Sequence, residues 1–291
     1  MVMTALGSTD RIVLDTNIVR GLIAAEPDCL HIPKLLQLKG AHPISIADGA
    51  FGELLAWLRR ADPALLRNVK PTMNRLDPLL DREFPIIVGG SQRLAMGGVI
   101  PWPVRSRADE SLLQDASWRH LRRVKDRHSL TKKQIEFRDT QGRTVVVTPT
   151  LPDSHLKASE EEWRSNVIEL PREQELTSEV EELIVKFRRE HAARRLKIDP
   201  RTLGLERIDL YSHFIARRQR DASRKTFQRP KELSSNDWFD ADLLLYAVLP
   251  AIICTNDGRF VRAVRQLRHE DRFRVMTLPQ LYEWLETGAL V

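Results

Sequence analysis

Short apolar runs that alternate with amphipathic segments constrain the fold of this chain more than any other feature. Residues 12–14 and 44–46 are compact apolar runs, and a polar turn with a helix-like segment follows each of them. In residues 49–60 the apolar side chains recur every three or four positions, which is typical of a half-buried helix. From residue 240 onward the alternation returns, with AIICT and FRVMT as strands and a closing helix near Pro279. The sequence therefore predicts an α/β fold with a parallel sheet.

The middle of the chain follows a different pattern and predicts an insertion between two halves of the α/β unit. Residues 88–103 contain two glycine pairs and two prolines, which indicates a loop or a boundary. Two alternating segments flank a turn at residues 139–142 and predict a β-hairpin. We expect three parts, namely residues 1–90, an insertion over 91–231, and residues 232–291.

A long helix is predicted to begin at Ser178, inside the insertion. The letters S-E-V-E match a capping box, in which the first side chain closes the helix N-terminus. The apolar residues Val180, Leu183, Ile184 and Phe187 recur at helical spacing and make one stripe. The far end of this helix is rich in arginine.

Composition excludes several classes of protein. The 291 residues include only two cysteines, Cys29 and Cys254, so no disulfide framework is expected and a reducing, cytoplasmic setting is the natural expectation. The apolar run over residues 243–254 is interrupted by Pro250 and is too short for a bilayer. The first residues lack the pattern of a signal peptide. Secreted, disulfide-rich and membrane proteins are therefore not expected.

The formal net charge of +6 is unevenly distributed along the chain. Basic residues greatly outnumber acidic ones over residues 186–231, whereas acidic residues dominate 153–182. A basic stretch attracts polyanions, and arginine contacts to phosphate are a usual source of affinity for nucleic acid. The arginines expected to bind nucleic acid are Arg188, Arg189, Arg194, Arg195, Arg217, Arg218 and Arg220. A solvated helix face, or pairing with the acidic stretch within one chain or across a homodimer, remains an alternative.

Acidic side chains recur where predicted strands end and helices begin. Asp15 follows the first strand, Glu53 lies in the helix after the second, Asp240 and Asp242 open a late helix, and Asp257 follows AIICT. The carboxyl ends of parallel strands share one edge, so these carboxylates are expected to converge. Converging carboxylates repel one another unless a cation such as Mg²⁺ or Mn²⁺ binds between them. Such a metal polarises a phosphodiester and activates water. Taken singly, each acid could instead be a turn or cap residue.

The motifs around these acids, taken in order, resemble the pattern of PIN-domain nucleases. They are LDTN, the glutamate of ADGAFGELL, an aspartate of NDWFDADLLLYA, and TNDGRF. The resemblance covers about residues 10–90 and 232–291. It implies a three-layer α/β/α fold and a ribonuclease that depends on Mg²⁺ or Mn²⁺.

The resemblance also assigns roles to individual residues. The four catalytic and metal-binding acids of the family correspond to Asp15, Glu53, Asp240 and Asp257. Asp237 and Asp242 are neighbours that could take the place of the third acid, and Asp242 is included among the candidate metal ligands. Asn17 and Thr255 match polar residues beside the first and last acids, where they are expected to orient carboxylates or a metal-bound water.

The leading functional hypothesis is a metal-dependent endoribonuclease. Such an enzyme could act as a toxin or defence effector and could have an inhibitor or partner protein. A structure-specific DNA nuclease is an alternative, because the same acidic cleft serves both polymers. A third hypothesis is a PIN-like module that binds RNA or a protein without cutting. A complete acidic set argues against that third hypothesis.

Overall fold

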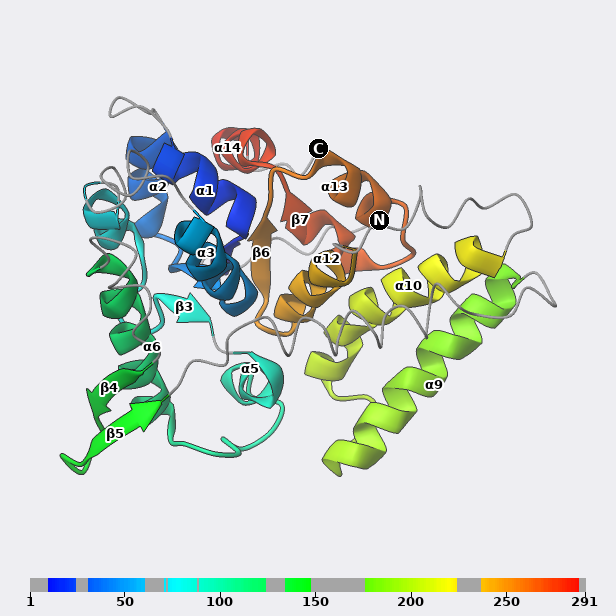
Figure 1. Cartoon of the computed structure of the whole chain (residues 1–291). Helices are drawn as coiled ribbons and strands as arrows, with labels where there is room; N and C mark the ends of the chain where they lie inside the picture. Colours follow the sequence, from blue (N-terminus) through cyan, green and yellow to red (C-terminus); the bar gives the residue numbers. More distant parts are fainter. Residues whose placement is uncertain are drawn as a thin grey trace.

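The chain folds around a single five-stranded parallel sheet (Figure 1). A computed structural model describes residues 10–24, 31–60, 71, 73–87, 89–123, 134–147, 176–223 and 237–287. The strand order is β3-β2-β1-β6-β7, and every neighbouring pair is parallel. The strands are β1 (Arg11–Leu14), β2 (Ile44–Ala47), β3 (Ile86–Ile87), β6 (Ala251–Cys254) and β7 (Val275–Met276). Their side chains are almost entirely buried, as expected for parallel strands covered on both faces.

The strand order of the sheet changes direction between β1 and β6. This position, the topological switch point of the sheet, is called the winding reversal below. The chain winds outward from β1 through β2 to β3, and later from β6 to β7 in the opposite direction. Right-handed crossovers then put the connecting helices of the two halves on opposite faces. The helical segments are α1 (Thr16–Ala24), α2 (His31–Lys39), α3 (Asp48–Arg60), η1 (Asp77–Leu79), α12 (Asp237–Leu244), η3 (Leu245–Val248), α13 (Gly258–Arg265), η4 (Glu270–Arg274) and α14 (Leu278–Thr287).

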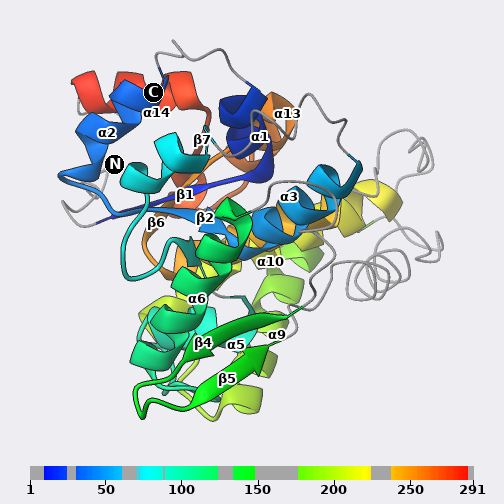
Figure 2. The same ribbon diagram turned by 60° about the vertical axis from the view of Figure 1, so that its left-hand side comes forward.

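The described parts of residues 91–231 pack onto this α/β unit rather than standing apart from it. They comprise most of α5 (Gly90–Met96), then α6 (Arg107–Arg122), the hairpin strands β4 (Ile135–Arg138) and β5 (Thr144–Val147), α9 (Ser178–Leu196) and α10 (Leu203–Ser223). Helices α9 and α10 pack against each other, and α10 also contacts η3 and α12 (Figures 1 and 2). Leu113, Phe137, Leu210 and Phe214 belong to the same hydrophobic core as the sheet residues. The insertion therefore contributes to one continuous core.

Several expectations from the sequence are confirmed. Both N-terminal strands, the strands within AIICT and FRVMT, and the closing helix near Pro279 are present. The hairpin is also present, with β4 and β5 antiparallel on either side of the predicted turn. No helix in the described part of the chain is long and apolar enough to cross a membrane.

Other expectations are wrong in instructive ways. Residues 88–103 contain the helix α5 rather than only a loop, and the short strand β3 just before them was not predicted. The α9 N-cap is Thr177, not Ser178, because the Thr177 hydroxyl accepts the hydrogen bond from the Val180 amide. The apolar stripe of α9 is present in the sequence but is not buried as a unit, since Leu183 and Phe187 are 63% and 61% exposed.

The exposure of Leu183 and Phe187 has a physical cause. The α9 face turned toward the rest of the protein carries Glu181, Val185 and Ala193, which are buried. Glu181 can occupy that face because Arg220 of α10 neutralises its charge. An interhelical ion pair therefore occupies a buried position on this face, and the apolar stripe lies partly outside it.

Candidate functional site

The candidate site lies at the C-terminal edge of the sheet, where β1 and β6 are neighbours and the winding reverses. Asp15 directly follows β1, and Thr255 directly follows β6. The Asp15 amide donates to the Cys254 carbonyl at 3.0 Å, so the two strand ends remain paired where the chains turn away. The crevice outside a winding reversal is the usual ligand-binding position in open α/β sheets.

Thr255 is the hydrogen-bond centre of this edge and is fully buried. Its hydroxyl donates to Asp15 Oδ2 at 2.8 Å and accepts from the Asn17 side-chain amide at 3.0 Å. The same hydroxyl oxygen accepts from the Asp257 backbone amide at 3.1 Å. The side-chain oxygen of Asn17, Oδ1, in turn accepts from the Asn256 backbone amide at 2.8 Å. Asn17 and Thr255 therefore join the two strand ends and fix the orientation of the Asp15 carboxylate.

Asp257 begins helix α13 on the other side of this centre. Its Oδ1 accepts from the amides of Arg259 and Phe260 at 2.8 and 3.0 Å, which makes it the N-cap residue. A cap of this kind uses one carboxylate oxygen and leaves Oδ2 outside these two bonds. Asp257 is therefore a helix-cap residue, as one alternative from the sequence expected, and it also lies beside Asp15.

The charges of Glu53 and Asp257 both act on Asp15. Burial, with smaller contributions from these two carboxylates, raises the pKa of Asp15 to about 6. Hydrogen bonds from Thr255 and the Thr16 amide oppose this rise. Within the part of the chain that the structure describes, none of these three carboxylates has an ion pair with lysine or arginine. Among the described residues, the centre therefore concentrates negative charge without a lysine or arginine paired to it.

This donor set suits a hard divalent cation that keeps much of its water. Among the described residues, no three acidic, histidine or cysteine side chains are grouped closely enough to hold a metal by themselves. Mg²⁺ commonly binds through one or two carboxylates and completes its shell with water and substrate oxygens. Asp15 and the uncapped oxygen of Asp257 are the described carboxylates that could form such an open shell, and Glu53 of α3 lies close enough to act on the charge of Asp15.

The candidates for the third acid are placed differently from one another. Asp240 is half-buried in α12. Asp242 faces Arg93 of α5, whose guanidinium binds both of its carboxylate oxygens at 3.1 to 3.3 Å and also its backbone carbonyl at 3.1 Å. Asp237 begins α12, and its side chain lies outside the described residues.

A second acidic cluster at the same sheet edge was missed from the sequence. Asp48 follows β2 directly, as Asp15 follows β1, so the signal was present. The Tyr246 hydroxyl donates to Asp48 Oδ1 at 2.5 Å, and Arg93 lies 4.6 Å from the Tyr246 ring centroid. Burial raises the pKa of Asp48, while Arg93 opposes that rise. Through Asp242, this cluster links the start of α3, which carries Glu53, to α12.

Gly89 shows how closely this cluster is packed. A Cβ atom at Gly89 would lie 1.8 Å from Asp48 Oδ2, a distance that two non-bonded atoms cannot adopt. The glycine before α5 is therefore required for that helix to bring Arg93 against Asp242.

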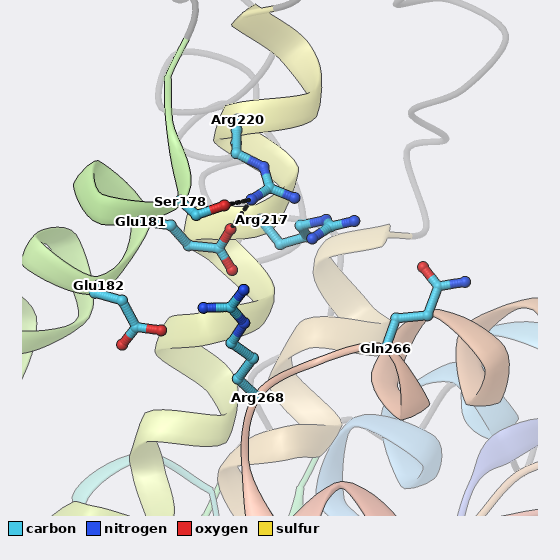
Figure 3. A pocket seen from close by; sticks show the side chains of 7 residues that line it. All are labelled: Ser178, Glu181, Glu182, Arg217, Arg220, Gln266 and Arg268. Atoms are coloured by element: carbon cyan, nitrogen blue, oxygen red, sulfur yellow. Dashed lines mark hydrogen bonds and ion pairs between the residues drawn. The ribbon is translucent and has the colours of Figure 1, made fainter.

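Most arginines of the predicted nucleic-acid-binding set have partners within the protein. Arg220 bridges Ser178 and Glu181 at 2.9 and 2.8 Å, as Figure 3 shows. Arg189 forms an ion pair with the buried Asp209. Glu181 belongs to the acidic stretch and Arg220 to the basic stretch. Their ion pair is therefore one instance of the alternative in which the two stretches pair within one chain.

The remaining arginines of the set differ in exposure. Arg217 lies 3.7 Å from Asp221, while Arg188 and Arg218 lie over the rings of Tyr211 and Phe214. Arg194 and Arg195 are exposed in the last turn of α9. Residues 153–175 and 224–231 lie outside the described residues, as does Cys29.

Similarity to known proteins adds nothing to this geometry. The chain matches no protein-family model, no curated protein and no solved structure.

Proposed function

We propose that the chain is a metal-dependent endoribonuclease of PIN-like, three-layer α/β/α architecture. The observation that carries the proposal is the group of mutually repelling carboxylates at the winding reversal, which has no basic partner among the described residues. A protein gains nothing in stability from such a group, because each charge there is costly to desolvate. Perturbed carboxylates in a crevice are a common mark of a functional site.

The proposed roles follow from position. Asp15 and Asp257 bind Mg²⁺ or Mn²⁺ directly, Glu53 adds charge from α3, and Asp240 completes the set from α12. Thr255 and Asn17 hold the Asp15 carboxylate in place through the contacts described above. When bound, the metal polarises a phosphodiester oxygen and lowers the pKa of a water nucleophile.

The strand order and the spacing of the acids support the PIN-like assignment. The acids expected from the motifs LDTN and TNDGRF follow adjacent central strands, β1 and β6. Glu53 lies on the helix after β2, the other neighbour of β1. A PIN-like centre requires these three elements to be adjacent.

The direct test is cleavage by the purified full chain of end-labelled RNA and DNA, with Mn²⁺ and with EDTA. We expect RNA to be cut internally with Mn²⁺, EDTA to stop cleavage, and Asp15→Asn to be inactive. Glu286→Gln is the matched control, because Glu286 is exposed on α14. Cleavage of DNA alone would favour the DNA nuclease alternative. Binding of RNA without any cleavage would favour a non-cleaving module.

A further inference from the structure

A centre built from carboxylates repels phosphate, so a nuclease must supply positive charge beside it. The arginines of α9 and α10 do this poorly, because most of them contact acidic or aromatic side chains of the protein. The helix that starts at Asp257 is a different source. Its sequence, GRFVRAVRQLR through Arg268, carries arginine at every third position.

Helix α13 presents these arginines from a rigid base. Phe260, Val261 and Val264 are buried and anchor one face of the helix in the core. Arg259 and Arg262 are exposed on the other side, one turn apart and therefore about 4.5 Å apart along the helix axis. Neither has an ion pair with a carboxylate within the described residues. Arg259 also lies immediately beside the Asp257 carboxylate, which accepts its backbone amide hydrogen.

The row continues beyond the helix to a small cavity of about 90 Å³. Arg268 enters this cavity from the end of α13, and Arg217 enters it from α10 (Figure 3). Glu181 on the cavity wall is neutralised by Arg220. Arg268 and Arg217 therefore add positive charge on this side of the molecule, although Glu182 also lines the cavity.

We propose that Arg259 and Arg262 of α13, continued by Arg268, bind the sugar-phosphate backbone of a single-stranded RNA substrate as it leaves the acidic centre. This inference rests on the proposed function and deepens it by naming the substrate-binding surface. A row of point charges suits a backbone better than a base, because it has no closed pocket and reads no sequence. Under this proposal, the arginines of α9 do not have the main role in binding RNA.

The test compares two double variants of equal charge change. Arg259→Ala/Arg262→Ala removes the proposed contacts, whereas Arg194→Ala/Arg195→Ala removes two exposed arginines from the last turn of α9. In Figures 1 and 2 that end of α9 and α13 lie at opposite ends of the molecule. Binding of labelled single-stranded RNA is measured in EDTA across a salt series, in the Asp15→Asn chain so that no cleavage occurs.

We expect the α13 variant to flatten the slope of log affinity against log salt by about 1.4, because each single-strand phosphate contact contributes about 0.7. Its affinity at low salt falls at least tenfold, the α9 variant keeps the parent slope, and Arg259→Lys/Arg262→Lys restores most of it. Both double variants should keep the parent melting temperature, since exposed substitutions change stability little.

An unchanged slope in the α13 variant, or an equal loss in both variants, overturns the proposal. These outcomes are separate from a failure of the proposed function. RNA binding measured in EDTA does not depend on the metal or on cleavage, whereas the endoribonuclease hypothesis fails if the chain does not cleave RNA or if cleavage does not require Mn²⁺ and Asp15.

Discussion

Two acidic groups lie at the same edge of the sheet and differ in a single kind of neighbour. Asp15, beside Glu53 and Asp257, has no basic partner among the described residues. Asp48 and Asp242 instead share Arg93, which is almost fully buried and binds Asp242 through both terminal guanidinium nitrogens. The buried arginine makes the second cluster a structural clamp, whereas the first has no such partner among the described residues, so a bound cation would balance its charge.

The largest expected difference between the clusters is catalytic. Asp15→Asn and Asp257→Asn should reduce Mn²⁺-dependent RNA cleavage below detection, because Asn keeps the shape but loses the charge that binds a cation. Asp242→Asn should retain cleavage when the protein is folded, because Asp242 is occupied by Arg93. Single-turnover cleavage at saturating Mn²⁺ measures this contrast, and full activity of Asp15→Asn would remove the basis for it.

The next effect is on folding and concerns the clamp. Arg93→Met should destabilise the protein by about 3 kcal/mol, near the lower end for breaking a buried ion pair, because the Asp242 side chain is 37% exposed. Arg93→Met/Asp242→Asn should recover part of that loss by removing the unpaired charge. Chemical denaturation of both variants measures the two values, and a single variant as stable as the parent would contradict the clamp.

A substitution that removes charge from the acidic centre should have the opposite effect and stabilise the folded protein. Because burial and like charge raise the pKa of Asp15 to about 6, ionised Asp15 costs folding free energy that is absent at pH 4 and fully present above pH 6. Asp15→Asn should therefore stabilise the metal-free protein by up to roughly 3 kcal/mol at pH 7 and by almost nothing at pH 4. Thermal melts in EDTA at both pH values test this, and equal effects would exclude the titration of Asp15 as the cause.

Metal binding should show the same titration. A cation displaces the Asp15 proton, so Mn²⁺ affinity should fall as the pH drops below about 6, approaching tenfold per pH unit if one proton is released. Calorimetric titration with Mn²⁺ between pH 5 and pH 7.5 measures the slope. A flat profile would show that Asp15 is not a ligand.

The smallest expected effect concerns Tyr246, whose hydroxyl donates to Asp48 and accepts from the Asp48 amide. Tyr246→Phe should destabilise the fold by about 1.5 kcal/mol, because two buried hydrogen bonds lose their partner. Cleavage at saturating Mn²⁺ should be unchanged in the folded variant. A loss of cleavage without a loss of stability would place the second cluster in the active centre.

Four of the five strands of the parallel sheet, and several acidic positions beside them, were predicted from the sequence; β3 was not. Apolar runs such as IVL and AIIC, bounded by polar turns, are typical of buried parallel strands. Such a strand satisfies the backbone hydrogen bonds and buries the apolar side chains. Asp15 and Asp257 were predicted as site residues because strand ends are local signals. Asp48 carried the same signal and could have been found by it.

Partner choice, in contrast, was decided only by the tertiary structure. Arg93 and Asp242 are 149 residues apart, and Tyr246 and Asp48 are 198 residues apart, so no local pattern links them. The arginines of α9 and α10 look alike in sequence, yet Arg189 and Arg220 are bound to buried acids while Arg194 and Arg195 face solvent. Periodicity states which residues share a helix face, but the packing of that face determines whether a charge meets a carboxylate, an aromatic ring or water.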